Sequence, residues 1–147
     1  MRYSPSTSAP PWMLRAFSEI GQAEVIDGEN ARIIEYHSAT NLSAKEDEVP
    51  WCSSFVCWCL EREGIKSTRS AWAKSYLTFG IKLQLPCEGA ICVFQRGPKS
   101  GHVGFYVHED ENWIFVLGGN QDNTVRIKNY PKSALLAIRY PLRDSMA

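Results

Sequence analysis

The sequence lacks an excess of charge of either sign, and it lacks a long hydrophobic run. Lysine and arginine together number 16, and aspartate and glutamate together number 16, so the formal net charge is zero. A chain without a basic surplus has no overall electrostatic attraction to nucleic acid or to an anionic membrane. No segment reaches the ~18 uninterrupted apolar residues of a membrane span. We therefore expect neither a nucleic-acid-binding protein nor a membrane-spanning one.

The N-terminus also lacks the pattern of a signal peptide. Residues 1–11 are rich in Ser, Pro and Thr, with no apolar run and no small-residue cleavage pattern. The five cysteines are an odd number, so a complete disulfide framework would leave one unpaired. We expect synthesis in the cytoplasm with reduced thiols, so that a target outside the cytoplasm would require delivery by other means.

A zinc site is a further possibility that the cysteine spacing disfavours. Cys57 and Cys59 lie two positions apart in a segment with helical periodicity. Two positions on a helix separate side chains by about 200°, so these thiols do not converge on one metal ion. Cys87 and Cys92 do not have the spacing of a zinc knuckle either. We expect no metal and no cofactor.

Length and composition indicate one domain. The chain has 147 residues, of which 44% are hydrophobic and 22% are charged, close to the averages of folded domains. Hydrophobic spacing predicts helices in the first half and short strands in the second, in the ranges 11–21, 29–38, 51–63 and 70–79 for helices and 90–94, 101–108, 113–117, 124–127 and 137–140 for strands. We predict an α+β fold, with N-terminal helices packed on a C-terminal antiparallel sheet in a single domain over residues 12–142. Residues 1–11 are then an extended arm and residues 143–147 a tail.

Cys52 stands where the third predicted helix begins, directly after Pro50 and Trp51. The first backbone N–H groups of a helix have no partner within the helix, and the helix dipole is positive there. Both effects lower the pKa of a thiol and favour the nucleophilic thiolate. On this basis we expect Cys52 to be the cysteine most reactive toward iodoacetamide. The alternative is a buried cysteine that serves only as a small apolar side chain.

Two later segments supply partners for such a nucleophile. His102 begins a predicted strand between Gly101 and Gly104, and a histidine there can accept the thiol proton and later protonate a leaving amine. Asn120 follows the next predicted strand, where a short polar side chain can hold an imidazole in orientation. The alternatives are a surface histidine at a strand end and a tight turn at Gly118–Asn120.

Five segments in order resemble the papain-like Cys-His-polar amidohydrolases of bacterial cell walls, the NlpC-type and CHAP-type families. They are Pro50–Val56, Ala73–Tyr76, Gly89–Phe94, Gly101–Tyr106 and Gly118–Val125. The resemblance implies a papain-like fold, with Cys52 as nucleophile, His102 as base and Asn120 as the residue that orients the imidazole. It departs from the expected pattern at Tyr76, where tryptophan is more usual.

Three more residues are candidates for oxyanion or substrate contacts. The resemblance to NlpC-type enzymes suggests that Tyr36, upstream of the nucleophile, polarises the scissile carbonyl; the alternative is an aromatic that only packs. Trp51, together with Trp72, is a candidate wall of a sugar-binding groove or a core residue. Gln121 is a candidate lining residue of the site or part of a turn.

The resemblance implies a peptidoglycan hydrolase, an amidase or endopeptidase that cleaves an amide bond of the wall peptide through an acyl-enzyme. Such a protein would act at the cell wall or periplasm, as a phage endolysin or as a delivered antibacterial toxin with an immunity protein as partner. We expect a monomer. The alternatives are a papain-like transferase or deamidase acting on a protein, and a catalytically inactive wall-binding module.

Overall fold

The first two helices each begin at a residue that suits a helix start. In the computed structural model, which describes residues 3–26, 28–41 and 50–142, α1 (Pro11–Ser18) opens with proline in its first turn. The Asn30 side chain caps α2 (Ala31–His37) by accepting hydrogen bonds from the amides of Arg32 and Ile33 at 2.8 and 3.3 Å. The other helical elements are α3 (Cys52–Arg62), η1 (Ala73–Thr78) and η2 (Lys132–Ala134).

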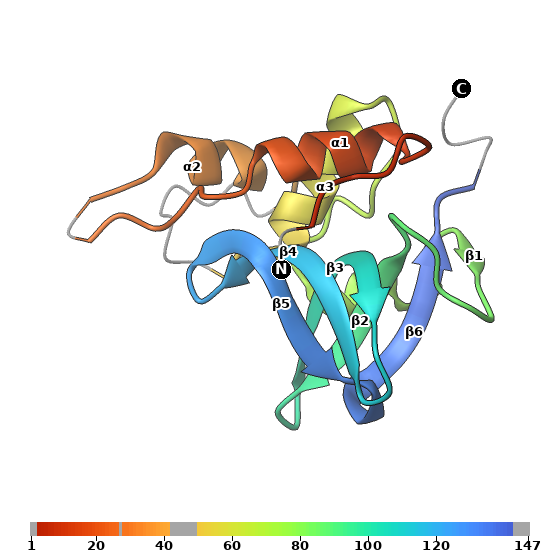
Figure 1. Ribbon diagram of the computed structural model, residues 1–147. Coiled ribbons are helices and arrows are strands. Elements are labelled where there is room, and N and C mark those ends of the chain that lie inside the picture. Colours follow the sequence, from red (N-terminus) through yellow and green to blue (C-terminus); the bar gives the residue numbers. More distant parts are fainter. Residues whose placement is uncertain (1–2, 27, 42–49, 143–147) are drawn as a thin grey trace.

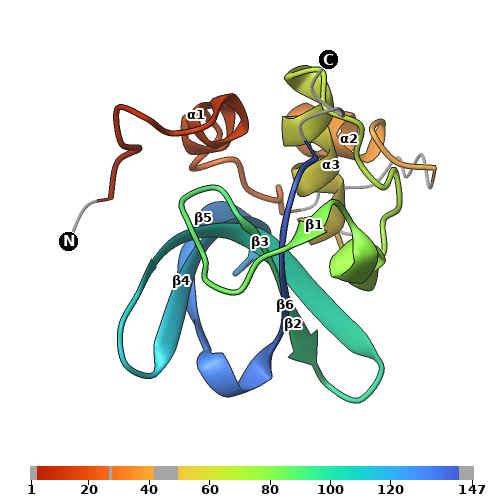
Figure 2. The ribbon, with the colours of Figure 1, turned by 90° about the vertical axis from the view of Figure 1, so that its right-hand side faces the viewer.

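The sheet of the second half has the order β1-β6-β2-β3-β4-β5, and every neighbouring pair is antiparallel. The strands are β1 (Ile81–Lys82), β2 (Ile91–Arg96), β3 (Ser100–Glu109), β4 (Trp113–Gln121), β5 (Thr124–Pro131) and β6 (Leu135–Tyr140). Figure 1 shows the helices α1, α2 and α3 as one layer over the sheet, and Figure 2 shows how strongly the sheet curls. The predicted α+β fold, helices on one side of an antiparallel sheet, is confirmed.

The helix α3 is the centre of the helical layer. Every residue from Cys52 to Leu60 is buried, because this helix contacts α1 and α2 on one side and β3 and β4 on the other. Phe55, for example, meets Phe105 of β3 in an edge-to-face contact with ring centroids 6.4 Å apart. The start of α3 is therefore held rigidly against the middle of the sheet.

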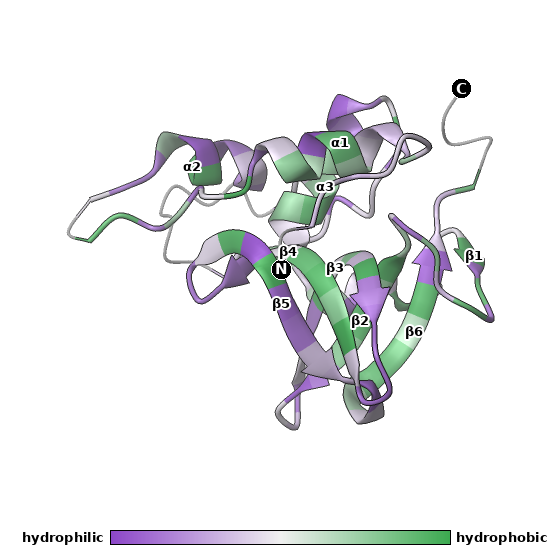
Figure 3. Ribbon diagram, viewed as in Figure 1, coloured by the Kyte–Doolittle hydropathy of each residue, from purple (hydrophilic) through white to green (hydrophobic). Residues whose placement is uncertain are grey.

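The curled sheet buries side chains on both faces. Val103, Phe105 and Leu117 pack with the helices, whereas Phe94 and Val116 belong to a second, smaller apolar cluster on the inner face of the curl. In Figure 3, β4 and β6 carry mostly hydrophobic residues, whereas the edge strand β5 is largely hydrophilic. Two apolar surfaces on one sheet explain why its central strands are hydrophobic almost without interruption.

The structure departs from the sequence prediction at several elements. The predicted helix 70–79 is a shorter 3-10 helix, β4 and β5 each continue four residues beyond their predicted ends, to Gln121 and Pro131, and β1 and η2 were not predicted. A bulge between Tyr106 and His108 interrupts the alternation of β3, and His108 lies opposite Phe115, on the other face of β3 from His102.

The predicted domain limits stay a prediction. The structure describes residues 3–10 of the predicted arm, and the amide of Ser6 donates to the Glu88 carboxylate at 2.9 Å. The predicted tail 143–147 lies outside the described residues. In the part of the chain that the structure describes, no helix is both long enough and apolar enough to cross a membrane.

Candidate active site

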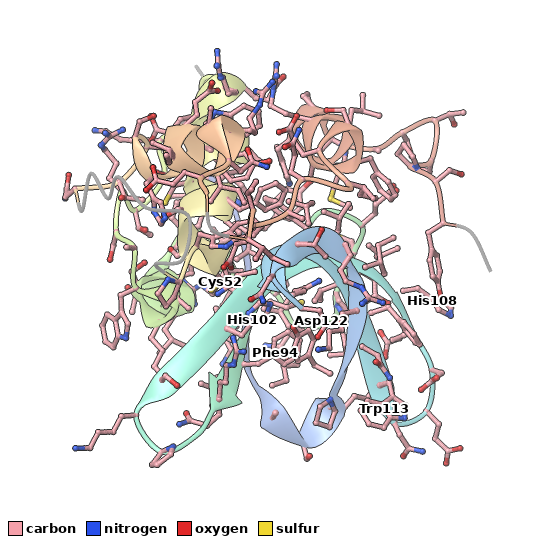
Figure 4. All side chains as sticks on the ribbon, turned by 90° about the vertical axis from the view of Figure 1, so that its left-hand side faces the viewer. Cys52, Phe94, His102, His108, Trp113 and Asp122 are labelled. Atoms are coloured by element: carbon pink, nitrogen blue, oxygen red, sulfur yellow. The ribbon has the colours of Figure 1, made fainter. Side chains whose placement is uncertain are left out.

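Cys52 is the first residue of α3 and lies beside β3, next to His102. The pairing of β3 with β4 runs from Glu109 to Phe105 and does not extend to Val103. The amide of Val103, beyond the last paired residue, instead faces the Cys52 thiol. Figure 4 shows Cys52 at the end of its helix and His102 directly below it on the strand. The predicted nucleophile and the predicted base are therefore neighbours in space.

Burial, rather than the helix start, dominates the acidity of Cys52. Only 6% of Cys52 is exposed, and this burial raises the pKa of its thiol. The amides of Val103 and Ser53 and the positive charge of Arg96 lower the pKa, but they offset only part of the cost of burying a thiolate. The expectation of a lowered pKa at Cys52 is therefore wrong, and the buried thiol is neutral.

His102 is fully buried on the inner face of the sheet. Its ring stacks on Tyr130 of β5, with centroids 4.8 Å apart and planes 24° apart, and Tyr130 stacks in turn on Phe94 at 5.0 Å. Burial lowers the pKa of His102 to about 4, although its hydrogen bond to Gln121 acts in the opposite direction. The imidazole is therefore neutral at pH 7, the form that a general base requires.

The hydrogen bonds of Gln121 fix the tautomer of that imidazole. The Nε2 amide of Gln121 donates to the carbonyls of Val116 and Arg126 at 3.3 and 2.6 Å, so its Oε1 atom is left as an acceptor. This oxygen lies 2.8 Å from Nε2 of His102, which must therefore carry the proton. The Nδ1 atom of His102 is buried and has no hydrogen-bond partner among the described residues. It is the nitrogen that remains free to accept a proton.

The orienting contact predicted for Asn120 is thus made by Gln121, one residue later. The register of β4 against β5 shifts between Gly118 and Gln121, and Asn120 has a positive φ of 56°. In a regular strand Asn120 would share the face of Gly118, which looks toward His102. The bulge turns Asn120 away, and it brings Gln121 onto that face instead. Strand alternation alone could not have identified this exchange.

The two glycines before the bulge are required by close contacts. A Cβ on Gly118 would lie 2.7 Å from Oε1 of Gln121 and 3.5 Å from Nε2 of His102. A Cβ on Gly119 would lie 2.7 Å from the Trp51 ring and 2.8 Å from Cβ of Phe55. Gly118 therefore makes room for the hydrogen bond of the histidine, and Gly119 allows β4 to pack against the start of α3.

Tyr36 does not reach the site. Its hydroxyl donates to Oε1 of Glu19 at 2.7 Å, and its side chain is fully buried. The ring makes a stacked contact with Trp51, with centroids 5.8 Å apart. This arrangement corresponds to the packing alternative for Tyr36, because its only hydroxyl proton is already committed.

Trp51 also belongs to the core rather than to a groove wall. It is fully buried, its indole Nε1 donates to Glu24 at 2.9 Å, and Gly119 lies against its ring. Trp72, the other candidate for a sugar-binding wall, is 59% exposed. Trp51 therefore supports the site from behind, by fixing β4 against the helix that carries Cys52.

A polar groove of about 550 Å³ opens beside the histidine. Gln121 and Tyr130, the two residues that contact the imidazole, both line it. The remaining lining residues are Glu24, Arg96, Asn120, Asp122, Asn123 and Lys128. Sequence reasoning did not identify Tyr130 or Arg96, because each comes from a strand whose place beside His102 is set only by the sheet. Cys52 and His102 do not line the groove themselves; it adjoins them through Gln121 and Tyr130.

The described residues contain no group of three or more His, Cys, Asp and Glu side chains arranged to hold a metal ion. All five cysteines are free, and Cys87 is the exposed one. The chemistry available at this site is therefore that of a thiol, an imidazole and an amide.

A cysteine at a helix start, a histidine on the neighbouring strand and a side-chain amide behind the histidine define the papain-like class of thiol hydrolase sites. The family model of the CHAP domain matches residues 44–120, more than half of the chain, and the chain belongs to the CHAP family. The match includes Cys52 and His102 and ends at Asn120, one residue before Gln121. CHAP domains are generally hydrolases that act on peptidoglycan, and this broad class applies to the chain. A comparison with curated proteins finds no match.

Proposed function

We propose that this protein is a cysteine-dependent peptidoglycan hydrolase that cleaves an amide bond of the wall peptide through an acyl-enzyme. In this proposal Cys52 is the nucleophile, His102 is the general base and Gln121 is the positioning residue. One observation carries the proposal above all others: Gln121 holds Nε2 of the buried His102 and leaves Nδ1 without a hydrogen-bond partner among the described residues, one residue before Val103, whose amide faces the Cys52 thiol. A histidine that only filled space in the core would not need one ring nitrogen held by a hydrogen bond and the other left without a partner.

The reaction begins with a neutral pair. Nδ1 of His102 accepts the proton of the Cys52 thiol as the sulfur attacks the scissile carbonyl carbon, and the carbonyl oxygen becomes an oxyanion. The backbone N–H of Cys52, at the start of α3, is the natural donor to that oxyanion. The imidazolium then gives its proton to the leaving amine as the C–N bond breaks. Water, deprotonated by the same nitrogen, hydrolyses the thioester and restores the thiol.

The neutral state of the pair at rest has a consequence for the mechanism. A thiol with a raised pKa beside an imidazole with a pKa of about 4 does not form an ion pair in the free protein. The proton must therefore move during attack, as in general-base catalysis, rather than before substrate binds. Exclusion of water by the Tyr130 and Phe94 stack protects the neutral imidazole.

The bond cleaved is either the sugar–peptide amide or a peptide bond of the stem or cross-link. The proposed setting is that of a phage endolysin or of a delivered antibacterial toxin, the latter with an immunity protein that covers the groove. The polar groove supports a peptide substrate, because amide groups need hydrogen-bond partners when they leave water.

Digestion of purified peptidoglycan tests this proposal. We expect the wild-type protein to release fragments whose masses, measured by liquid chromatography and mass spectrometry, identify one cleaved amide bond. Cys52→Ala should release none, whereas Cys87→Ala, which removes the exposed thiol, should match the wild type. Release of the same fragments by Cys52→Ala would refute the thiol mechanism. Intact peptidoglycan together with a Cys52-dependent change in the mass of a protein substrate would favour the transferase or deamidase alternative.

A further inference from the structure

Arg96 stands at the mouth of the groove on the same face of the sheet as the catalytic histidine. Phe94 of β2 pairs with His102 of β3, and Arg96 pairs with Ser100, two residues farther along. Side chains two residues apart on a strand point to the same face, about 7 Å from one another. Arg96 therefore projects toward the groove from beside the Phe94–Tyr130–His102 stack, and it lines that groove with Tyr130.

The guanidinium of Arg96 is close enough to the reacting groups to act on them. Its positive charge lowers the pKa of the Cys52 thiol and the pKa of the His102 imidazole, in both cases as a smaller effect than burial. A negative group bound by Arg96 would therefore lie in the groove that adjoins the imidazole, on the same face of the sheet as His102.

The other charges that line the groove already have partners. Asp122 accepts from both Arg126 and Lys128, at 2.6 and 2.8 Å. Glu24 accepts from the Trp51 indole at 2.9 Å. Arg96 is exposed, and no carboxylate among the described residues lies within ion-pair distance of it. Among the described residues, Arg96 is therefore the cation of the groove lining that has no ion-pair partner.

We propose that Arg96 binds a free carboxylate of the peptide substrate next to the scissile amide, and so makes the enzyme selective for stems that carry that carboxylate unamidated. This inference rests on the proposed function for the identity of the substrate. A guanidinium offers two parallel N–H donors that match the two oxygens of a carboxylate, and a carboxamide cannot accept both. Peptidoglycan stems present such groups: the α-carboxyl of D-glutamate, which is either free or amidated, and the terminal carboxyl.

Binding measured without turnover tests the inference. The probes are the peptide L-Ala-γ-D-Glu-L-Lys-D-Ala, whose free carboxylates are the glutamate α-carboxyl and the terminal carboxyl, and two versions of it, each amidated at one of these two groups. Titration of Cys52→Ala, followed by NMR, gives the affinity for each peptide. We expect Arg96→Gln in this background to weaken binding of the free-acid peptide by about tenfold or more. One of the two amidated peptides should lose this dependence on Arg96. Arg96→Lys should restore part of the affinity.

Lys82→Gln is the matched control, because it also removes one positive charge but from the exposed β1 strand, outside the groove. It should leave all three affinities unchanged. Equal weakening of all three peptides by Arg96→Gln, or no binding of any of them, would overturn the inference.

Failure of the inference and failure of the proposed function have different signatures. Wild-type protein that cleaves peptidoglycan, together with an Arg96→Gln variant that keeps the same affinity for all three peptides, would overturn the inference alone. Carboxylate-selective binding that depends on Arg96, in a protein whose wild-type form cleaves nothing, would support the inference and overturn the proposed function.

Discussion

The side-chain oxygen of Gln121 lies 2.8 Å from Nε2 of His102, and this contact joins β4 to β3 beyond the point where their backbone pairing ends. Where the backbones of β3 and β4 no longer pair, this side-chain hydrogen bond connects the two strands. It leaves the strands apart at the position where Cys52 faces the Val103 amide. The arrangement therefore creates the opening for the thiol and fixes the imidazole with the same residue.

This contact predicts that Gln121 contributes more to catalysis than Asn120. Gln121→Ala removes the acceptor that holds the proton on Nε2, so we expect kcat/KM to fall by roughly 10²- to 10⁴-fold, as when a triad loses its orienting residue. Asn120→Ala removes a groove side chain that does not hold the imidazole and should retain most of the activity. Rates on purified peptidoglycan check both variants.

The same pair provides a second, independent check. Gln121 acts only through His102, so Gln121→Ala should add little to the loss already caused by His102→Ala. Additive losses in the double variant would contradict the positioning role, and so would a larger loss in Asn120→Ala than in Gln121→Ala.

The two adjacent glycines should respond differently to the same added methyl group. Gly118→Ala places a Cβ against the Gln121 amide, so we expect loss of activity that exceeds its loss of stability. Gly119→Ala places a Cβ against the Trp51 ring, so we expect about 1–3 kcal/mol of lost unfolding free energy from overpacking. Urea unfolding and the peptidoglycan assay, run on both variants, separate the two effects. Equal stability with equal activity in the two variants would argue against these contacts.

The order of cysteine alkylation follows from exposure. Cys87 is exposed, whereas 6% of Cys52 is accessible and burial raises the pKa of its thiol. In the free protein at pH 7 we therefore expect iodoacetamide to modify Cys87 before Cys52, the reverse of what a helix-start position alone suggests. Peptide mapping by mass spectrometry after short exposures gives the order. Rapid alkylation of Cys52 would show that the site opens readily without substrate.

The buried His102 should make stability depend on pH. Its pKa is about 4 in the folded protein against an ordinary value of 6.5, so the unfolded chain binds the proton more tightly. Above about pH 6.5 the histidine is neutral in both the folded and the unfolded protein, and the unfolding free energy has its full value. As the pH falls toward about 4, the unfolded chain takes up the proton first, so the unfolding free energy decreases by about 3 kcal/mol. Urea unfolding at a series of pH values measures it.

Histidine variants isolate this contribution. His102→Gln should flatten the decline of unfolding free energy between pH 6.5 and pH 4. His108→Gln, which changes an exposed histidine on the far side of the sheet in Figure 4, should keep the decline. An identical slope in both variants would mean that His102 is not the group responsible.

The sequence by itself determined the class of fold and placed the two proposed reacting residues on their elements. Helical spacing from Cys52 to Leu60 and alternation from His102 onward are local patterns, and they place Cys52 at the first residue of α3 and His102 near the start of β3. Those patterns arise because one face of each helix or strand is buried, and a buried face produces hydrophobic periodicity in the sequence.

Only the tertiary structure decided which polar residue meets the histidine and how acidic the thiol is. The β4 bulge exchanges Asn120 for Gln121, and a bulge inserts one residue without an obligatory sequence signal. Burial of Cys52 and His102 comes from strands and helices distant in sequence, and it outweighs the local helix start. Arg96 and Tyr130 likewise reach the groove through the order of strands in the sheet. Desolvation and strand register are properties of the packed chain. They determine the pKa values and the contacts of residues whose places in helices and strands the local patterns predict.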